Sequence, residues 1–172
     1  MSVNDPLIRM NVHFLQQGIE LLQDLTNKQY RFDNSPYFSS SAGKHMRHVI
    51  DHYLSLTKGK PSTVDYDARA RDTRLEQERM YAIAVIEECM ANLKELGKGT
   101  DFNDFVKVRS NDGQADGDDG WSRSSVNREL QFLIGHTVHH YALIAFIVRV
   151  QDFIPPEGFG IAPSTLQHKK HQ

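Results

Sequence analysis

The chain has 172 residues, of which 39% are hydrophobic and 24% charged, and its formal net charge is −2. This length can bury a core of its own, and we expect residues 1–172 to form a single domain. The balanced charge offers no broad basic surface, which argues against nucleic acid as a partner. No apolar run approaches the roughly 18 residues of a membrane span, and no signal-peptide pattern opens the chain. Cys89 is the only cysteine, so an internal disulfide is excluded and we expect a cytoplasmic protein.

The first helix is predicted at residues 7–25, where apolar residues recur at helical spacing. Asp5 and Pro6 before this run are typical of a helix cap followed by a first-turn proline. Residues 27–38 break the pattern and carry turn residues at 34–36, so they are expected to form a connection that crosses the end of a helical bundle.

Two further helices are predicted in the middle of the chain. The second helix covers about residues 41–57, with Ser41 among its cap candidates, and the sequence at 58–61 ends it. A short polar stretch follows at 62–66. The third helix is predicted at 68–96, because its later apolar residues repeat with helical period and glycines follow it.

The segment before the last helix differs in composition. Residues 102–110 contain enough β-branched and aromatic residues for a short strand. Residues 111–120 are rich in Asp and Gly and are expected to be a mobile loop or a hairpin tip. Their composition is similar to a calcium loop, but no register places the required oxygen ligands, the central glycine and the terminal glutamate together. A solvated turn is therefore the preferred interpretation.

The fourth helix is predicted at about 124–152, capped within residues 122–125 and ended by the prolines at 155–156. The tail at 157–172 has few apolar residues and is expected to pack back onto the body through three of them: Phe159, Ile161 and Leu166. Four helical patterns with few strand signals predict an all-α fold, a four-helix bundle with a short irregular or hairpin insertion before its last helix.

Most of the nine histidines lie on the second and fourth predicted helices. His136 and His140 are one helical turn apart, about 40° from each other around the axis, at the edge of the apolar stripe. His139 lies roughly 60° to the other side of His136 and is expected nearer the surface. The second helix carries His45 and His48, together with His52, all beside its own apolar stripe.

Two imidazoles at a core edge need partners for four ring nitrogens, and a divalent cation supplies them while both rings stay neutral. A lone histidine at such a place is usually structural, but metals in bundles are held between facing helices. Any one of His45, His48 and His52 could be a third ligand, because periodicity does not choose among them. A three-histidine site keeps a coordination position open for water or substrate, as in catalytic sites.

These two segments, Ser41-Ala-Gly-Lys-His-Met-Arg-His48 and His136-Thr-Val-His-His140, resemble those of the DinB-like (YfiT-like) metalloenzyme superfamily. The resemblance implies a four-helix bundle with a long first crossover. It also implies a metal site made of His48, His136 and His140, and it leaves the remaining histidines of both helices unassigned. Relatives of known activity include hydrolase-like members and transferases or isomerases that use low-molecular-weight thiols, and members often dimerise.

We therefore expect a metal-dependent enzyme that acts on a small molecule, as a hydrolase or a thiol-dependent transferase and as a homodimer. Imidazole donors suit zinc, nickel, iron and copper, and the residues do not decide among these metals. Zinc and nickel are expected first. The alternative is a non-catalytic metal- or ligand-binding bundle with a sensor or stress-response role.

No catalytic residue is assigned from the sequence. Asp51, one turn beyond His48, could act as a base or accept an imidazole N–H. It points away from the apolar stripe, however, so an exposed carboxylate is the preferred interpretation. Glu129 and Tyr141 flank the histidine pair, and Tyr141 is expected to pack in the core. Cys89 is expected to be a small buried hydrophobe.

Overall fold

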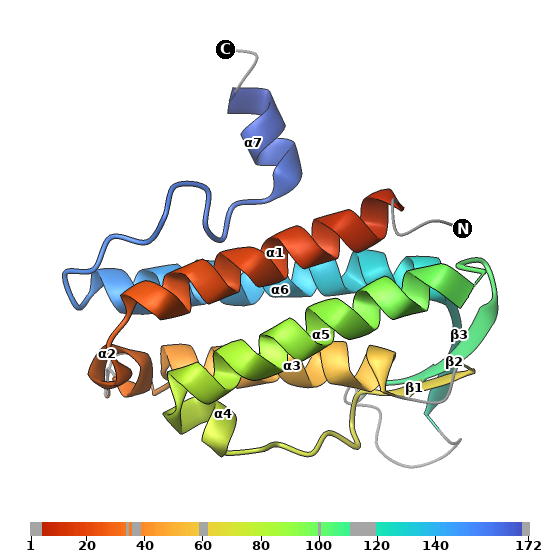
Figure 1. Ribbon diagram of the computed structural model, residues 1–172, viewed down its shortest axis with the longest axis horizontal. Helices are drawn as coiled ribbons and strands as arrows, with labels where there is room; N and C mark the ends of the chain where they lie inside the picture. Colours follow the sequence, from red (N-terminus) through yellow and green to blue (C-terminus); the bar gives the residue numbers. More distant parts are fainter. Residues whose placement is uncertain are drawn as a thin grey trace.

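The computed structural model describes residues 5–33, 35, 39–58, 62–99, 101–110 and 120–169, and it is mostly helical (Figure 1). Its four long helices are α1 (Pro6–Asp24), α3 (Ala42–Thr57), α5 (Arg79–Gly99) and α6 (Val126–Arg149). Its short helices are α2 (Asn27–Arg31), α4 (Arg74–Gln77) and α7 (Pro163–Lys169). Three strands complete the fold: β1 (Thr63–Asp65), β2 (Phe105–Arg109) and β3 (Trp121–Ser125). The helical class is confirmed, with a small sheet added to it.

The predicted starts of three long helices are confirmed by their caps. The carboxylate of Asp5 accepts a hydrogen bond from the backbone N–H of Leu7 at 2.8 Å, with proline next in sequence. Ser41 Oγ accepts from the N–H of Lys44 at 3.1 Å, and Ser125 Oγ accepts in the same way at the start of α6. These side chains satisfy N–H groups that have no partner inside a helix.

The single helix predicted at residues 68–96 is wrong. The carboxylate of Asp65 accepts hydrogen bonds from the backbone N–H groups of Asp67 and Ala68, at 2.9 and 3.0 Å, and this turn keeps the chain out of a helix. Arg71 then takes a positive φ of 51°. Helix α4 follows as a single short turn, and α5 continues past the predicted end to Gly99. The connection predicted at 27–38 likewise contains α2.

The strand predicted within residues 102–110 is confirmed as β2, which is the centre of the sheet. Strand β1 pairs with it in parallel, with Val64 opposite Val108, and β3 pairs with it antiparallel. The hairpin alternative for the insertion before the last helix is confirmed by this antiparallel pair, although residues 121–125 were not themselves predicted as a strand. Strand β1 was not predicted, because it is short and polar. The turn at 34–36, the stop at 58–61 and the loop at 111–120 fall wholly or largely outside the described residues.

Each long helix packs against two others: α1 against α5 and α6, and α3 against the same pair. Figure 1 shows that α1 and α6 run in one direction and that α3 and α5 run in the other. Helix α2, in the first connection, lies at one end of the molecule (Figure 1). The second connection carries β1 at the opposite end and then returns along the helices to α4 (Figure 1). The long crossover is therefore the second connection and not the first, because α3 and α5 run in the same direction.

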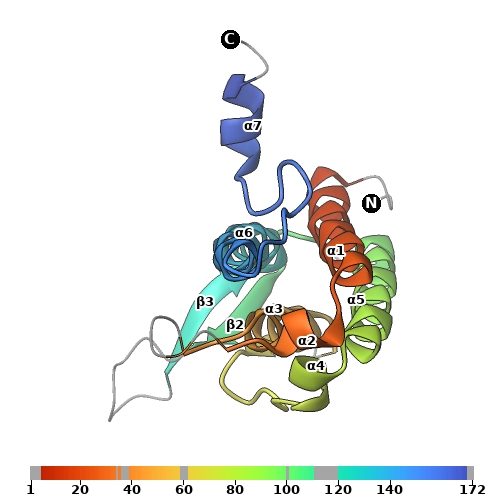
Figure 2. The same ribbon diagram turned by 90° about the vertical axis from the view of Figure 1, so that its left-hand side faces the viewer.

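The tail after α6 packs back through Phe159, as predicted. This ring is buried and stacks on Tyr141, with ring centroids 4.4 Å apart. Helix α7 stands away from the four long helices, while the sheet lies beside α3 and α6 (Figure 2).

Among the described helices, α6 is long and apolar enough to cross a membrane by length and composition. Its buried side is taken up by packing against α1 and α3.

Candidate metal centre

Three of the predicted histidines meet between α3 and α6. Their ligand atoms, one from each of His48, His136 and His140, all lie within 4.8 Å of one another. His136 and His140 project from successive turns of α6, and their ring centroids are 4.6 Å apart. His48 faces them from α3, with its centroid 5.0 Å from His136 and 4.6 Å from His140. The three rings that the family resemblance selected are thus close enough to hold one ion.

Two more histidines of α3 complete what we call the histidine cluster, which consists of His45, His48, His52, His136 and His140. His45 Nδ1 lies 2.9 Å from Nδ1 of His140. The ring of His52 lies 4.0 Å from that of His136, centroid to centroid, and stacks on Tyr66 at 5.0 Å. His139 is exposed, as predicted from its place on the helix.

The hydrogen bonds limit which ring nitrogens can reach an ion. His140 uses Nδ1 for His45, which leaves its Nε2 available. His136 Nδ1 is buried and has no hydrogen-bond partner among the described residues. His52 Nδ1 lies 2.8 Å from the backbone carbonyl of His48 and donates to it, since a carbonyl only accepts. A cation would satisfy the buried ring nitrogen of His136 that the protein leaves unpaired.

Burial keeps the cluster neutral. Burial, with the neighbouring histidines as a smaller cause, lowers the pKa of His136 to about 2 and the pKa values of His48 and His140 to about 3. Burial also lowers the pKa of His52 to about 4, against the opposing effect of its bond to the His48 carbonyl. A metal ligand must present a lone pair, so neutral imidazoles at pH 7 are the protonation state that metal binding needs.

Arg69 is a neighbour of the cluster that the sequence did not indicate. It lies between β1 and α4, and its Nη1 is 3.3 Å from His48 Nδ1 and 3.3 Å from each ring nitrogen of His52. Only the path of the second connection brings this side chain to the histidines. A sequence pattern confined to one helix carries no signal for it.

The preferred interpretation of Asp51 as an exposed carboxylate is wrong. Asp51 is buried, with 4% of its surface exposed. Arg47 Nη1 lies 3.8 Å from it, and Arg47 also pairs with Glu76 at 2.9 Å. Burial raises the pKa of the Asp51 carboxyl, and the nearby arginines oppose this effect. The side of α3 that points away from the apolar stripe is covered by α4 and β1, which contact it.

Glu129 is buried beside the cluster and is held at both oxygens. Tyr66 Oη donates to Glu129 Oε2 at 2.9 Å, and Ser124 Oγ donates to Oε1 at 2.5 Å. Tyr66 stacks on His52, so the carboxylate fixes a ring that packs against the histidines. A cavity of about 150 Å³ opens next to Glu129, with Tyr66, Arg128 and Phe132 in its lining.

Tyr141 and Cys89 are core residues, as predicted. Tyr141 is fully buried and donates its hydroxyl to the backbone carbonyl of Phe14 at 3.0 Å. Cys89 is fully buried as well, and burial raises the pKa of its thiol to about 12. A thiol that stays protonated at neutral pH is not a nucleophile.

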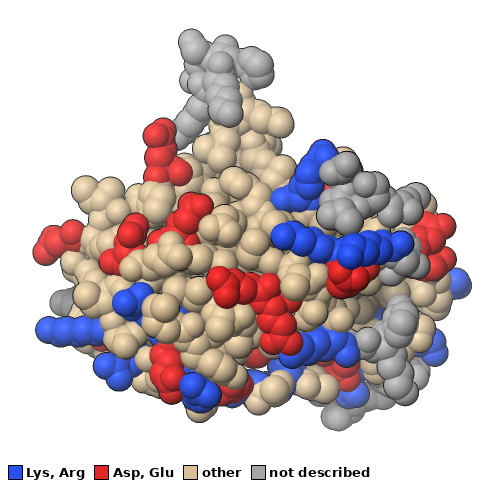
Figure 3. Space-filling view, viewed as in Figure 1, with Lys and Arg blue, Asp and Glu red and all other residues tan. Residues whose placement is uncertain are grey.

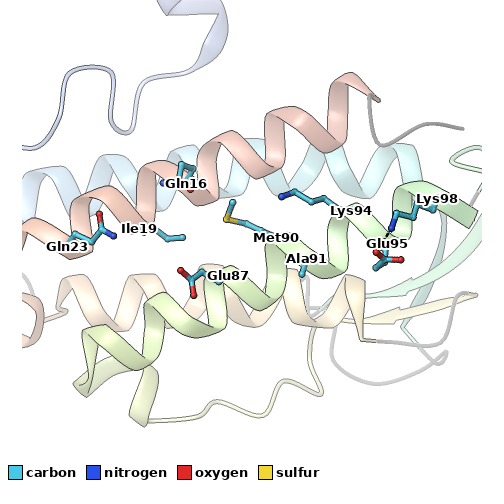
Figure 4. Close-up of a pocket in the computed structure, with 9 residues that line it drawn as sticks. All are labelled: Gln16, Ile19, Gln23, Glu87, Met90, Ala91, Lys94, Glu95 and Lys98. Atoms are coloured by element: carbon cyan, nitrogen blue, oxygen red, sulfur yellow. Dashed lines mark hydrogen bonds and ion pairs between the residues drawn. The ribbon is translucent and has the colours of Figure 1, made fainter.

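A larger hollow lies elsewhere. Between α1 and α5 is a groove of about 660 Å³, shown in Figure 4, which we call the α1–α5 groove. Its lining consists of Gln16, Ile19, Gln23, Glu87, Met90, Ala91, Lys94, Glu95 and Lys98. Acidic and basic side chains are mixed over this face of the molecule (Figure 3). The lining includes no member of the histidine cluster, so this groove and the converging histidines are in different places.

Comparison with known proteins gives one informative similarity. No family model matches the chain, and no solved structure matches it. A curated protein of Rhizopus delemar, FK506-binding protein 5, is 32% identical over 127 residues, which cover 71% of this chain and 33% of that protein. The chain thus spans about a third of the length of the curated relative it matches.

Proposed function

We propose that the protein is a divalent-metal-dependent enzyme of the DinB-like type that acts on a small molecule, with His48, His136 and His140 as the metal ligands. The observation that carries this proposal is the convergence of three neutral imidazoles, with ligand atoms within 4.8 Å of one another. The unpaired buried Nδ1 of His136 fits a cation. Zinc and nickel are the first candidates, since imidazole donors suit both.

The bound ion would supply a Lewis acid that lowers the pKa of a coordinated water or binds a thiolate co-substrate. Three protein ligands would leave a position for such a group. His45 would hold His140 through the 2.9 Å contact between their Nδ1 atoms, so that Nε2 of His140 faces the ion. These roles suit hydrolysis or thiol-dependent group transfer.

Two features support the DinB-like assignment. One histidine comes from the second long helix, and a His-x-x-x-His pair comes from the last long helix, which is the arrangement that the resemblance implies. The four long helices also pack pairwise in one closed order. We propose a bundle of this type, present as a homodimer in the cytoplasm.

The name of the Rhizopus relative favours a second candidate, a non-catalytic ligand-binding or metal-binding helical unit. That name refers to the binding of FK506 by a protein of which this chain spans 33%. Under this second proposal the histidine cluster would hold an ion without turnover.

Elemental analysis of the purified protein, reloaded with zinc or nickel after treatment with a chelator, tests the metal site. We expect one ion per chain in the wild type and in His139→Ala, and none in His136→Ala. His139 is the matched control because it lies on the same helix but is exposed. Full metal content in His136→Ala would refute the assignment of the ligands.

A panel of esters, amides and thiol co-substrates then separates the two candidates. Turnover that stops on metal removal supports the enzyme. Stoichiometric metal with no turnover on the panel, together with binding of FK506, would favour the non-catalytic unit.

A further inference from the structure

Among the described residues, the guanidinium of Arg69 is hydrogen-bonded only to imidazoles. Its Nη1 lies 3.3 Å from His48 Nδ1 and 3.3 Å from each ring nitrogen of His52. It can donate to His48 Nδ1 and to His52 Nε2, but not to His52 Nδ1, which donates its own proton to the carbonyl of His48. The side chain is half-buried, and its Nε is buried without a hydrogen-bond partner among the described residues. A guanidinium has five N–H donors, so most of the hydrogen-bonding capacity of Arg69 is not used by the described residues.

The charge of Arg69 is also not matched by a close carboxylate. No described carboxylate oxygen lies within 4.0 Å of its guanidinium nitrogens, although Asp51 and Asp67 both act on it from further away. Asp51 itself is held by Arg47 at 3.8 Å. Burial lowers the pKa of Arg69, and Arg71 and Arg47 lower it further. An arginine in such surroundings stays charged, because its pKa starts near 12.5.

The connection around Arg69 is fixed by several contacts. Val64 of β1 pairs with Val108 of β2, and Tyr66 is bonded to the buried carboxylate of Glu129. Asp65 closes the turn that leads to Arg69. The guanidinium is thus held beside the histidines before any ligand arrives, which lowers the entropic cost of using it for binding.

A metal ion at His48, His136 and His140 would place a second positive centre next to this guanidinium. Two neighbouring positive charges repel each other in a half-buried site, and the attraction of both to an anion bound between them would offset that repulsion. The planar fork of arginine fits the two oxygens of a carboxylate or a phosphate. Arg69 also lines a cavity of about 300 Å³, together with Lys58 and the carboxylates of Asp51 and Asp65. No member of the histidine cluster is in that lining, so the cavity adjoins the histidines only through Arg69 and can take the part of a small molecule that lies beyond the guanidinium.

We propose that Arg69 and the metal ion together bind an anionic group, a carboxylate or a phosphate, so that the substrate of the enzyme is a small organic anion. This inference rests on the metal site proposed above. Arg69 then acts as a substrate-binding residue, with its remaining N–H groups directed at the anion that the ion also contacts.

Cobalt-loaded protein allows a direct test, because the visible spectrum of Co²⁺ changes when an anion enters its coordination sphere. Inorganic phosphate and acetate are titrated into the wild type, Arg69→Gln and Arg69→Lys. We expect saturable spectral shifts in the wild type, with a dissociation constant at least tenfold weaker in Arg69→Gln. The lysine variant keeps the charge without the fork and should lie between the two.

Arg71→Gln is the matched control. This arginine is exposed and stands two residues further along the same connection, so its variant should bind the anions as the wild type does. Metal stoichiometry and thermal unfolding are measured for every variant. An Arg69→Gln protein that holds cobalt and binds both anions with unchanged affinity overturns the role of Arg69 and leaves the metal site standing.

Two other outcomes are equally decisive. Failure of the wild type to hold cobalt, zinc or nickel overturns the proposed function and this inference with it. Anion binding that is equally tight in the cobalt-loaded and the metal-free wild type, when both are titrated by calorimetry, overturns the shared role of the ion. A response to phosphate alone, or to acetate alone, supports the proposal and identifies the group.

Discussion

The α3–α6 interface and the α1–α5 groove are both built from two long helices side by side, yet their polar groups behave differently. In the groove, the charged side chains are exposed and can satisfy one another, as Lys98 and Glu95 do at 2.6 Å. At the α3–α6 interface the imidazoles are half-buried and converge, and the Nδ1 of His136 lacks a partner among the described residues. The groove is the larger hollow. Buried polar groups that converge but leave hydrogen-bonding atoms without partners are a better indicator of a functional site than the volume of a hollow is.

The largest expected effect is on thermal stability: substitutions at the α3–α6 interface should abolish the stabilisation by a metal ion, whereas substitutions in the α1–α5 groove should not. An ion at about a thousand times its dissociation constant stabilises the fold by about 4 kcal/mol. For a chain of this size that corresponds to a rise in the melting temperature of roughly 8 to 16 °C. Thermal unfolding with zinc and with a chelator measures it. Lys94→Ala in the groove should keep the whole shift and His140→Ala should lose it, so the opposite pattern would place the ion elsewhere.

Acid should destabilise the metal-free protein through the α3–α6 interface. The unfolded chain protonates its histidines below about pH 6.5, whereas the folded pKa values of His48 and His140 are about 3, and that of His136 is about 2. Their stabilising effect is therefore complete above pH 6.5 and declines as the pH falls. At pH 4 the loss is on the order of 1 kcal/mol for each histidine, after allowing for half exposure.

Urea unfolding at pH 7 and pH 4, with a chelator present, checks this pH dependence. The variant His136→Gln removes one of the three groups and should lose less stability on acidification than the wild type does. Equal losses in the two proteins would show that the histidines do not cause the effect.

Glu129→Ala should have a smaller effect, a loss of about 2 kcal/mol in the free energy of unfolding. The substitution leaves the hydroxyls of Tyr66 and Ser124 without their acceptor in a buried place. Glu95→Ala in the α1–α5 groove is the matched control and should change stability by less than about 0.5 kcal/mol. Equal effects of the two substitutions in chemical denaturation would remove the distinction between the regions.

Of the four predicted effects, that of His45→Ala should be the smallest. This variant should bind the metal about tenfold more weakly, and the stability of its metal-free form should change little. His45 contacts Nδ1 of His140, and the loss of such an outer partner typically weakens a site by about 10-fold to 100-fold. Competition with a chromophoric chelator measures the affinity. His139→Ala should match the wild type, and a loss of affinity in that variant would mean that exposed histidines also contribute.

The parts of the fold predicted correctly depend on neighbours in the sequence. Asp5, Ser41 and Ser125 cap helices within three residues of themselves, so the starts of α1, α3 and α6 could be predicted. His136 and His140 share a helix, and geometry alone places them together. The choice of His48 came from the family resemblance, and the structure brings this histidine to the other two.

The parts that were missed depend on residues far apart in the chain. Strand β1 is three residues long and exists because β2 pairs with it. Asp51 faces away from the apolar stripe of its own helix, so helical periodicity predicts that its carboxylate is exposed. In the structure, β1 and α4 contact α3 and cover that side. Arg69 reaches the histidines only because the second connection returns along α3. Such contacts have no signal in a local pattern.

The separation of the histidines along the chain also determines when an ion can bind during synthesis. His45 and His140 are 95 residues apart, and α6 is the last of the four long helices to leave the ribosome. A nascent chain that ends at β2 already carries the α3 histidines but has none of the α6 pair to set against them. If the proposed metal site is correct, an ion would meet all three of its ligands only after α6 has been made, so it would stabilise helices that have already formed.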